Sequence, residues 1–235
     1  MSASTRPAEN QNFRDFTAAR FHMVEGQIRP NKVTDERILE ALGRLPREIF
    51  VPSPMAGIAY SDEDLQIAPN RYLMEPMVLA RLLQEAAIKP GHRVLDIGPT
   101  TGYSSAALAA LAQEVVAVEC DPVLMQKAVF NLETLKITNV EAQLGPLQEG
   151  WSHNGPYDII LINGSIDRLP DALAAQLAEG GRLMVVMRHY GPAQAAHTGE
   201  ARLYEKIHGA LSYRPLFDAN IKPLPGFSSP AQFKF

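Results

Sequence analysis

The stretch that most constrains this chain is a short apolar run ending in glycine, at residues 93–103. It reads Arg-Val-Leu-Asp-Ile-Gly-Pro-Thr-Thr-Gly-Tyr. Val94, Leu95 and Ile97 lack helical spacing, which is typical of a strand buried on both faces of a parallel sheet. The Ala-rich residues 104–111 that follow are good helix formers. The stretch therefore predicts a strand, a tight glycine turn and a helix.

An acidic residue stands about 20 residues beyond that turn, the spacing of a nucleotide-binding βαβ unit. It is Glu119, at the end of a second apolar run over residues 115–118. A carboxylate there can accept hydrogen bonds from both hydroxyls of a ribose. Glycine at the turn, as at Gly98 and Gly102, lets a ligand approach the backbone closely. The alternative is a turn that only connects strand to helix, with a solvated Glu119.

The rest of the chain alternates predicted strands and helices. Strands are expected near residues 139–144, 157–163 and 183–187, and antiparallel edge strands over 201–217. Helices are expected near residues 122–132 and 169–178. Thr34 is the predicted N-cap of a helix before the first strand, and Asp121 is the predicted N-cap of the helix near residues 122–132. Residues 46–76 are predicted to form a Pro-rich irregular connection. The alternation predicts an α/β fold, a doubly wound Rossmann-like sheet with an N-terminal helical extension.

Composition narrows the classes of function. The chain has 235 residues, a net charge of -4 and a single cysteine, Cys120. The acidic balance disfavours nucleic acid as the main partner, and one cysteine cannot form an intrachain disulfide framework. The histidines show no metal-ligand spacing, so no metal is expected. With no membrane span or signal peptide in the pattern, the expected location is cytoplasmic.

Several blocks of residues carry a resemblance to a known family. They are Met-Val-Glu-Gly-Gln-Ile-Arg at 23–29, Pro-Arg-Glu-Ile-Phe-Val-Pro at 46–52, Ala-Tyr at 59–60, and the segments 76–81, 94–103, 118–119, 157–160 and 180–182. Together they resemble the protein-L-isoaspartate O-methyltransferase family, which belongs to the S-adenosylmethionine-dependent methyltransferases. The resemblance covers residues 23–217, and its N-terminal blocks are the specific part.

The resemblance implies a seven-stranded sheet whose last strand is antiparallel. It also implies methyl transfer from S-adenosylmethionine to the carboxylate of an isoaspartyl residue in a damaged protein. Residues 1–75 would form N-terminal helices and a substrate-side loop, and residues 76–235 the cofactor-binding core. By position, the cofactor would be bound by Asp96, Gly98, Pro99, Thr100, Gly102, Glu119, Cys120 and Pro146. The substrate side would be formed by Arg71, Tyr72, Leu73, Met74, Glu75 and Pro76.

The chain departs from the family pattern at three motifs. Met74 stands where the family has the serine usually assigned the active-site role, and Tyr72 replaces a threonine, so no catalytic residue is identified. Thr100 replaces the middle glycine of the cofactor loop. Pro146 stands where an acidic residue is expected to accept from the adenine amine. Loss of that acceptor predicts a decrease of about tenfold to a hundredfold in cofactor affinity.

Two functions remain open from the sequence. The first is a divergent methyltransferase acting on a carboxylate of a protein, a peptide or a small acid. An isoaspartyl carboxylate, with a reference pKa near ~4, needs no general base, and Arg71, if it folded inward, could bind it with two hydrogen bonds. This function requires an adenosyl-sized hollow beside Gly98. The second is a catalytically degenerate member that acts as a binding or scaffold module. The oligomeric state is left open.

Overall fold

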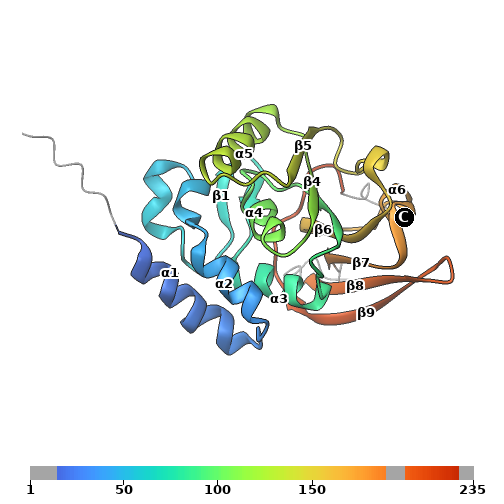
Figure 1. Ribbon diagram of the computed structural model, residues 1–235, viewed down its shortest axis with the longest axis horizontal. Coiled ribbons are helices and arrows are strands. Elements are labelled where there is room, and N and C mark those ends of the chain that lie inside the picture. Colours follow the sequence, from blue (N-terminus) through green and yellow to red (C-terminus); the bar gives the residue numbers. More distant parts are fainter. Residues whose placement is uncertain (1–14, 189–198, 228–235) are drawn as a thin grey trace, which may run out of the picture.

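The computed structural model describes residues 15–188 and 199–227. Its main sheet has seven strands in the order β5-β4-β3-β6-β7-β8-β9 (Figure 1). The strands are β3 (Arg93–Ile97), β4 (Glu114–Glu119), β5 (Val140–Leu144), β6 (Tyr157–Ile166), β7 (Leu177–Arg188), β8 (Gly199–Ile207) and β9 (Ala210–Ala219). The first five pair in parallel. The predicted doubly wound α/β sheet of about seven strands is thus confirmed.

The last two strands close the sheet differently from the first five. β8 pairs antiparallel with β7, and β9 pairs antiparallel with β8. Figure 1 shows β8 and β9 as a long hairpin that extends beyond the rest of the sheet. The antiparallel edge strands expected over residues 201–217 are confirmed. The strand that runs opposite to the others is β8, however, and not the last strand, because β9 is antiparallel to β8 and so runs in the direction of β7.

The strand predicted from residues 94–97 is β3, and it lies inside the sheet. Val94, Leu95 and Ile97 of β3 are fully buried, and β3 pairs with β4 on one side and β6 on the other. The strand order reverses between β3 and β6, and ligands of open α/β sheets bind outside the carboxyl ends of the strands at such a point. The turn that begins at Gly98 lies at this edge.

Six α-helices accompany the sheet in the described residues, and the first three of them precede its first strand in the chain. The helices are α1 (Thr17–Met23), α2 (Glu36–Arg44), α3 (Pro76–Ala86), α4 (Tyr103–Ala109), α5 (Pro122–Thr134) and α6 (Asp171–Ala175). π-helical η1 (Val24–Ile28) and 3-10 helical η2 (Arg29–Asn31) continue α1. The predicted cap of α5 is present, since the Asp121 carboxylate accepts from the backbone N–H groups of Val123 and Leu124. No described helix is long and apolar enough to span a membrane.

Three local predictions need correction. The N-cap of α2 is Asp35, whose carboxylate accepts from the Arg37 N–H at 3.0 Å, and not Thr34. The helix predicted over residues 169–178 is only α6, because Leu177 already begins β7. The connection over residues 46–76 is ordered: it contains 3-10 helices η3 (Arg47–Phe50) and η4 (Ser53–Ile58) and a hairpin of β1 (Leu65–Ala68) and β2 (Arg71–Leu73). Pro-rich composition concealed these short elements, which depend on tertiary packing.

Candidate functional site

The carboxyl ends of β3 and β4 bring the glycine turn and Glu119 together. Gly98 and Gly102 have φ of +73° and +95°, where a side chain is strained. Thr100 has φ +57°, which costs a residue with a Cβ about 1 kcal/mol. The Thr100 N–H donates to Glu119 Oε2 at 3.0 Å. Four of the predicted cofactor residues therefore share one small region, as the βαβ pattern predicted.

The other predicted cofactor residues lie around this turn. Pro99 is buried and Pro146 is exposed beyond β5. Cys120 is exposed, and partial burial, together with the neighbouring charge of Glu119, raises the pKa of its thiol. A thiol with a raised pKa is mostly protonated at neutral pH and is a poor nucleophile.

A buried carboxylate lies behind the turn. Asp96 is fully buried and accepts hydrogen bonds from the hydroxyls of Ser104 and Ser105 at 2.8 and 2.7 Å. The Asn163 amide donates to its other oxygen. Burial outweighs these hydrogen bonds and raises the pKa of Asp96 to about 6. Asp96 thus fixes the start of α4 and one residue of β6 relative to the turn.

The hairpin that leads into α3 places an arginine against Glu119. Arg71 is 4% exposed and Glu119 is fully buried. The Arg71 Nη1 and Nη2 atoms donate one to each oxygen of the Glu119 carboxylate. A bidentate pair of this kind is among the strongest side-chain contacts in proteins. The Arg71 guanidinium, which could have bound a substrate carboxylate if it folded inward, does fold inward but is held by Glu119.

The Glu119 carboxylate has no free hydrogen-bonding capacity. Besides Arg71 and Thr100, the backbone N–H groups of Cys120 and Asp121 donate to Oε1 at 2.8 and 3.1 Å. A carboxylate has about four acceptor positions, and five N–H groups already point at this one. Nothing remains for a pair of ribose hydroxyls.

A second side chain, from the C-terminal part of the chain, lies against the glycine turn. Leu224 is 4% exposed, and a Cβ added at Gly98 would meet its Cδ1 atom at 2.9 Å. The Leu224 N–H donates to the Ser165 carbonyl at 2.9 Å, and the Ser165 N–H donates to the Lys222 carbonyl at 3.0 Å. The segment at residues 221–224 is therefore held along β6 at the edge where the predicted hollow should lie.

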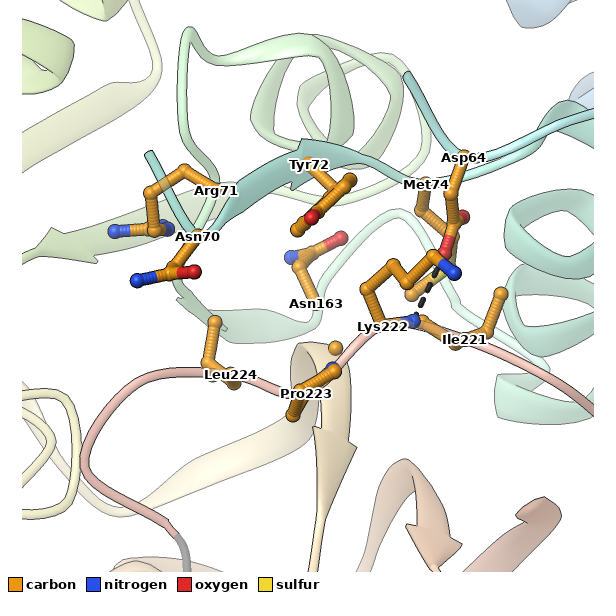
Figure 2. Close-up of a pocket in the computed structure, with 11 residues that line it drawn as sticks. Asp64, Asn70, Arg71, Tyr72, Met74, Asn163, Ile221, Lys222, Pro223 and Leu224 are labelled. Carbon is orange, nitrogen blue, oxygen red and sulfur yellow. Dashed lines mark hydrogen bonds between the residues drawn. The ribbon is translucent and has the colours of Figure 1, made fainter. Parts of the chain in front are cut away.

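Figure 2 shows this edge from close by, with Tyr72 and Met74 on one side, residues 221–224 on the other, and Asn163 between them. Two cavities remain there, each of about 10 Å³. That is room for about one water molecule, whereas ligand pockets span roughly 300–1,000 Å³. The adenosyl-sized hollow predicted beside Gly98 is absent among the described residues.

The remaining substrate-side residues form the lining of these cavities and the start of α3. Tyr72 and Met74 line both cavities, and Leu73 lines one. Glu75 is half-buried, and its backbone N–H donates to the Asp64 carboxylate at 3.0 Å. Burial, together with the charges of Asp64, Asp62 and Glu63, raises the pKa of Glu75 to about 7. Pro76 is the first residue of α3.

Comparison with known proteins identifies the family. The family model for protein-L-isoaspartate(D-aspartate) O-methyltransferase matches residues 19–219. The chain belongs to this family. Protein-L-isoaspartate O-methyltransferase of Koribacter versatilis is 34% identical over 219 residues, covering 93% of this chain and 96% of the relative. That of Methylorubrum extorquens is 33% identical, covering 92% and 96%.

Solved structures agree with the family assignment. A protein-L-isoaspartate O-methyltransferase superposes with a TM-score of 0.75 and 26% identity, covering 88% of this chain and 66% of that chain. A Plasmodium falciparum protein described as a putative protein-L-isoaspartate O-methyltransferase, in complex with S-adenosyl-L-homocysteine, has a TM-score of 0.73 at 20% identity, covering 87% and 97%. The predicted membership of the S-adenosylmethionine-dependent methyltransferases is confirmed, and nothing in these comparisons favours the degenerate scaffold.

The cofactor of the isoaspartate O-methyltransferase family does not fit the described conformation of this member. Its ribose would need the Glu119 oxygens that Arg71 occupies, and its adenosyl group would need the space beside Gly98 that Leu224 fills. The turn and the acidic residue are present, as in a nucleotide-binding βαβ unit. The disagreement comes from two side chains and not from the scaffold.

Sequence reasoning missed two residues of this site. Leu224 lies outside the matched residues 19–219, and no pattern in the Pro-containing tail indicated its position. Asn163 was not among the predicted site residues. In the structure it joins Asp96 to both small cavities. Its place at the end of a buried apolar run was the signal that could have identified it.

Proposed function

We propose that this chain methylates the side-chain carboxylate of isoaspartyl residues in damaged proteins or peptides, with S-adenosylmethionine supplying the methyl group. The observation that carries the proposal is the family match over residues 19–219. Relatives of that name are 33% to 38% identical. We favour this function over a scaffold role because the match includes the glycine turn and Glu119. The hollow that the function requires is filled by the side chains of Arg71 and Leu224 and not by the backbone, so the scaffold of the site is kept.

We assign the two sides of the site as follows. Residues 76–235 form the cofactor-binding core, with Asp96, Gly98, Pro99, Thr100, Gly102, Glu119, Cys120 and Pro146 nearest the cofactor. Residues 1–75 form the N-terminal helices and the substrate side, which Pro76 completes at the start of α3. This division is supported by the hairpin β1–β2, because Tyr72 and Leu73 of β2 line a small cavity together with the turn at residues 98–100.

The reaction needs little acid–base chemistry from the chain. An isoaspartyl carboxylate has a reference pKa near ~4 and is ionised at neutral pH. The thioether of Met74 cannot donate a hydrogen bond, so the loss of the family's serine removes an orienting contact and no proton transfer. The remaining tasks are alignment and exclusion of water. Buried neighbours such as Leu73 and Met74 provide the exclusion.

We further propose a protein or peptide partner and a cytoplasmic location, without nucleic acid or a membrane as the main partner. The net charge of -4 supports a partner other than a polyanion. The single cysteine is consistent with a reducing compartment.

Transfer of a labelled methyl group tests the function. The purified chain is incubated with millimolar labelled S-adenosylmethionine and a peptide that contains one isoaspartyl residue, and the same peptide with normal aspartate serves as the control. We expect saturable, base-labile label in the isoaspartyl peptide only. Absence of label in both peptides would contradict the proposed function.

A further inference from the structure

We propose that Arg71 and Leu224 close the adenosyl site of this chain, and that the cofactor binds only after both side chains have withdrawn. This inference rests on the proposed function, because it concerns how the same site admits its cofactor. It goes beyond that function by assigning the control of cofactor entry to two named residues and to the segments that carry them.

The first part of the closure is direct competition for Glu119. The Arg71 guanidinium donates to both carboxylate oxygens, and backbone N–H groups occupy the remaining positions. Ribose hydroxyls would have to donate to the same oxygens, so the two partners exclude each other. Arg71 Nε, although buried, has no hydrogen-bond partner among the described residues. This lost hydrogen bond lowers the stability of the closed state and favours exchange of the arginine for a ligand.

The second part of the closure comes from a segment outside the family match. Residues 220–227 follow the matched region 19–219. Leu224 fills the space in front of Gly98 and also touches Gly164, where an added Cβ would meet the Leu224 Cβ at 2.9 Å. Glycine at both positions leaves room for the leucine side chain, which packs against both. A cofactor approaching Gly98 closely must displace this side chain.

One carboxylate connects the two closing segments. Asp64 accepts from the Glu75 N–H through Oδ1 at 3.0 Å and from the Lys222 N–H through Oδ2 at 2.9 Å. The second contact is the dashed line in Figure 2. Glu75 lies at the end of the hairpin that carries Arg71, and Lys222 lies two residues before Leu224. Asp64 therefore links the arginine and leucine segments, so that opening of one favours opening of the other.

Closure lowers the apparent affinity for the cofactor by the fraction of molecules that are open. Removing the closing side chains removes that factor while Glu119 and the glycine turn remain. The variant Arg71→Met with Leu224→Ala keeps the Glu119 carboxylate and its backbone donors. Asp64→Ala keeps both closing side chains and removes only their link, so a smaller gain in affinity is expected from it.

Calorimetric titration with S-adenosylhomocysteine tests the proposal. We expect the Arg71→Met, Leu224→Ala double variant to bind at least about tenfold more tightly than the wild type. The matched controls are Arg93→Met, at a surface ion pair with Glu114, and Leu211→Ala, on the exposed face of β9. Both controls should bind like the wild type. If the wild type binds S-adenosylhomocysteine and the double variant binds it with the same affinity, the closure is overturned. The proposed function would remain intact.

Two further results complete the test. If neither the wild type nor any variant binds S-adenosylhomocysteine at millimolar concentration, both the closure and the proposed function are overturned. Hydrogen exchange on the wild type avoids any folding defect of the variants. S-adenosylhomocysteine should speed the exchange of the Leu224 amide, which is bonded to the Ser165 carbonyl in the closed state. Ligand binding with undiminished protection of that amide would contradict the displacement of residues 220–227.

Discussion

Two buried arginines in this molecule are held in opposite ways. Arg47 is fully buried and donates to backbone carbonyls, from Nε to Ala59 at 2.6 Å and from Nη2 to Met74 at 2.7 Å. Its guanidinium also lies 4.6 Å from the centre of the Tyr103 ring. Arg71, by contrast, is held mainly by one side-chain carboxylate. Main-chain acceptors cannot leave without unfolding of the segments, whereas a carboxylate can exchange one partner for another.

The difference also follows the match to the family. Arg47 belongs to the block Pro-Arg-Glu-Ile-Phe-Val-Pro on which the resemblance rests, whereas the sequence analysis expects Arg71 to lie in a segment that departs from the family pattern. Burial lowers the pKa of Arg47. No carboxylate pairs with it in the contacts of the described residues, which makes its backbone contacts essential. We infer that Arg47 stabilises the shared fold and that Arg71 modifies the site of this particular chain.

The largest effect is expected from removal of Arg47. Arg47→Ala leaves the Ala59 and Met74 carbonyls without their donor and opens a cavity beside Tyr103. The expected decrease in the free energy of unfolding is about 4–5 kcal/mol, measured by urea denaturation. Arg44→Ala, at an exposed pair with Glu40 on α2, should change it by about 0.5 kcal/mol or less. A loss at Arg47 as small as that of this control would remove the distinction between the two arginines.

The second prediction concerns the Arg71–Glu119 pair. Glu119→Gln leaves the buried guanidinium uncompensated and should cost about 3 kcal/mol. Arg71→Met should cost less, about 2 kcal/mol, because backbone N–H groups still bond the Glu119 carboxylate. The double variant should lie within about 1 kcal/mol of the wild type, since removal of a whole buried pair is often nearly neutral. All are measured by urea denaturation at one pH.

Additivity decides whether this interpretation is right. Strong coupling between the two substitutions, with the double variant more stable than Glu119→Gln alone, shows that the pair acts as a unit. Losses that simply add would mean that each side chain contributes through separate contacts. The pair would then resemble Arg47, and the comparison between the two arginines would fail.

How far the sequence could predict this molecule depends on the range of the contacts involved. Periodicity and turn chemistry are local, and they correctly placed β3, the cap at Asp121 and the glycine turn. The N-cap at Asp35, one residue from the predicted Thr34, shows the usual uncertainty of helix ends. Helix α6 was overpredicted because the helical pattern of residues 169–178 continues into a strand fixed by its neighbours in the sheet.

The candidate site was predicted only in part, for the same physical reason. Gly98, Thr100 and Glu119 are brought together by adjacent parallel strands, whose order the βαβ pattern implies. The Arg71–Glu119 contact joins residues 48 positions apart in the chain, and Leu224 reaches Gly98 from beyond the matched region. No local pattern specifies which long-range side chain fills a hollow. A resemblance predicts where a hollow is expected, and not which side chains of this chain fill it.

The smallest predicted effect concerns Glu75, where the hairpin that carries Arg71 enters α3. Burial and nearby carboxylates raise the pKa of Glu75 from 4.5 to about 7. Well below pH 4.5 the group is protonated in both the folded and the unfolded chain. As the pH rises toward 7 the unfolded chain releases this proton first, so the contribution of Glu75 to stability is lost over that range. Glu75→Gln should therefore gain stability relative to the wild type between pH 5 and pH 7.5. Because the side chain is only half-buried, the gain should be about 1 kcal/mol.

Urea denaturation at pH 5 and pH 7.5 measures this gain, with Glu133→Gln on the exposed face of α5 as the control. A gain independent of pH would show that Glu75 ionises normally in the folded chain. Glu75 would then place no buried charge that opposes the Arg71 and Asp64 contacts of the hairpin.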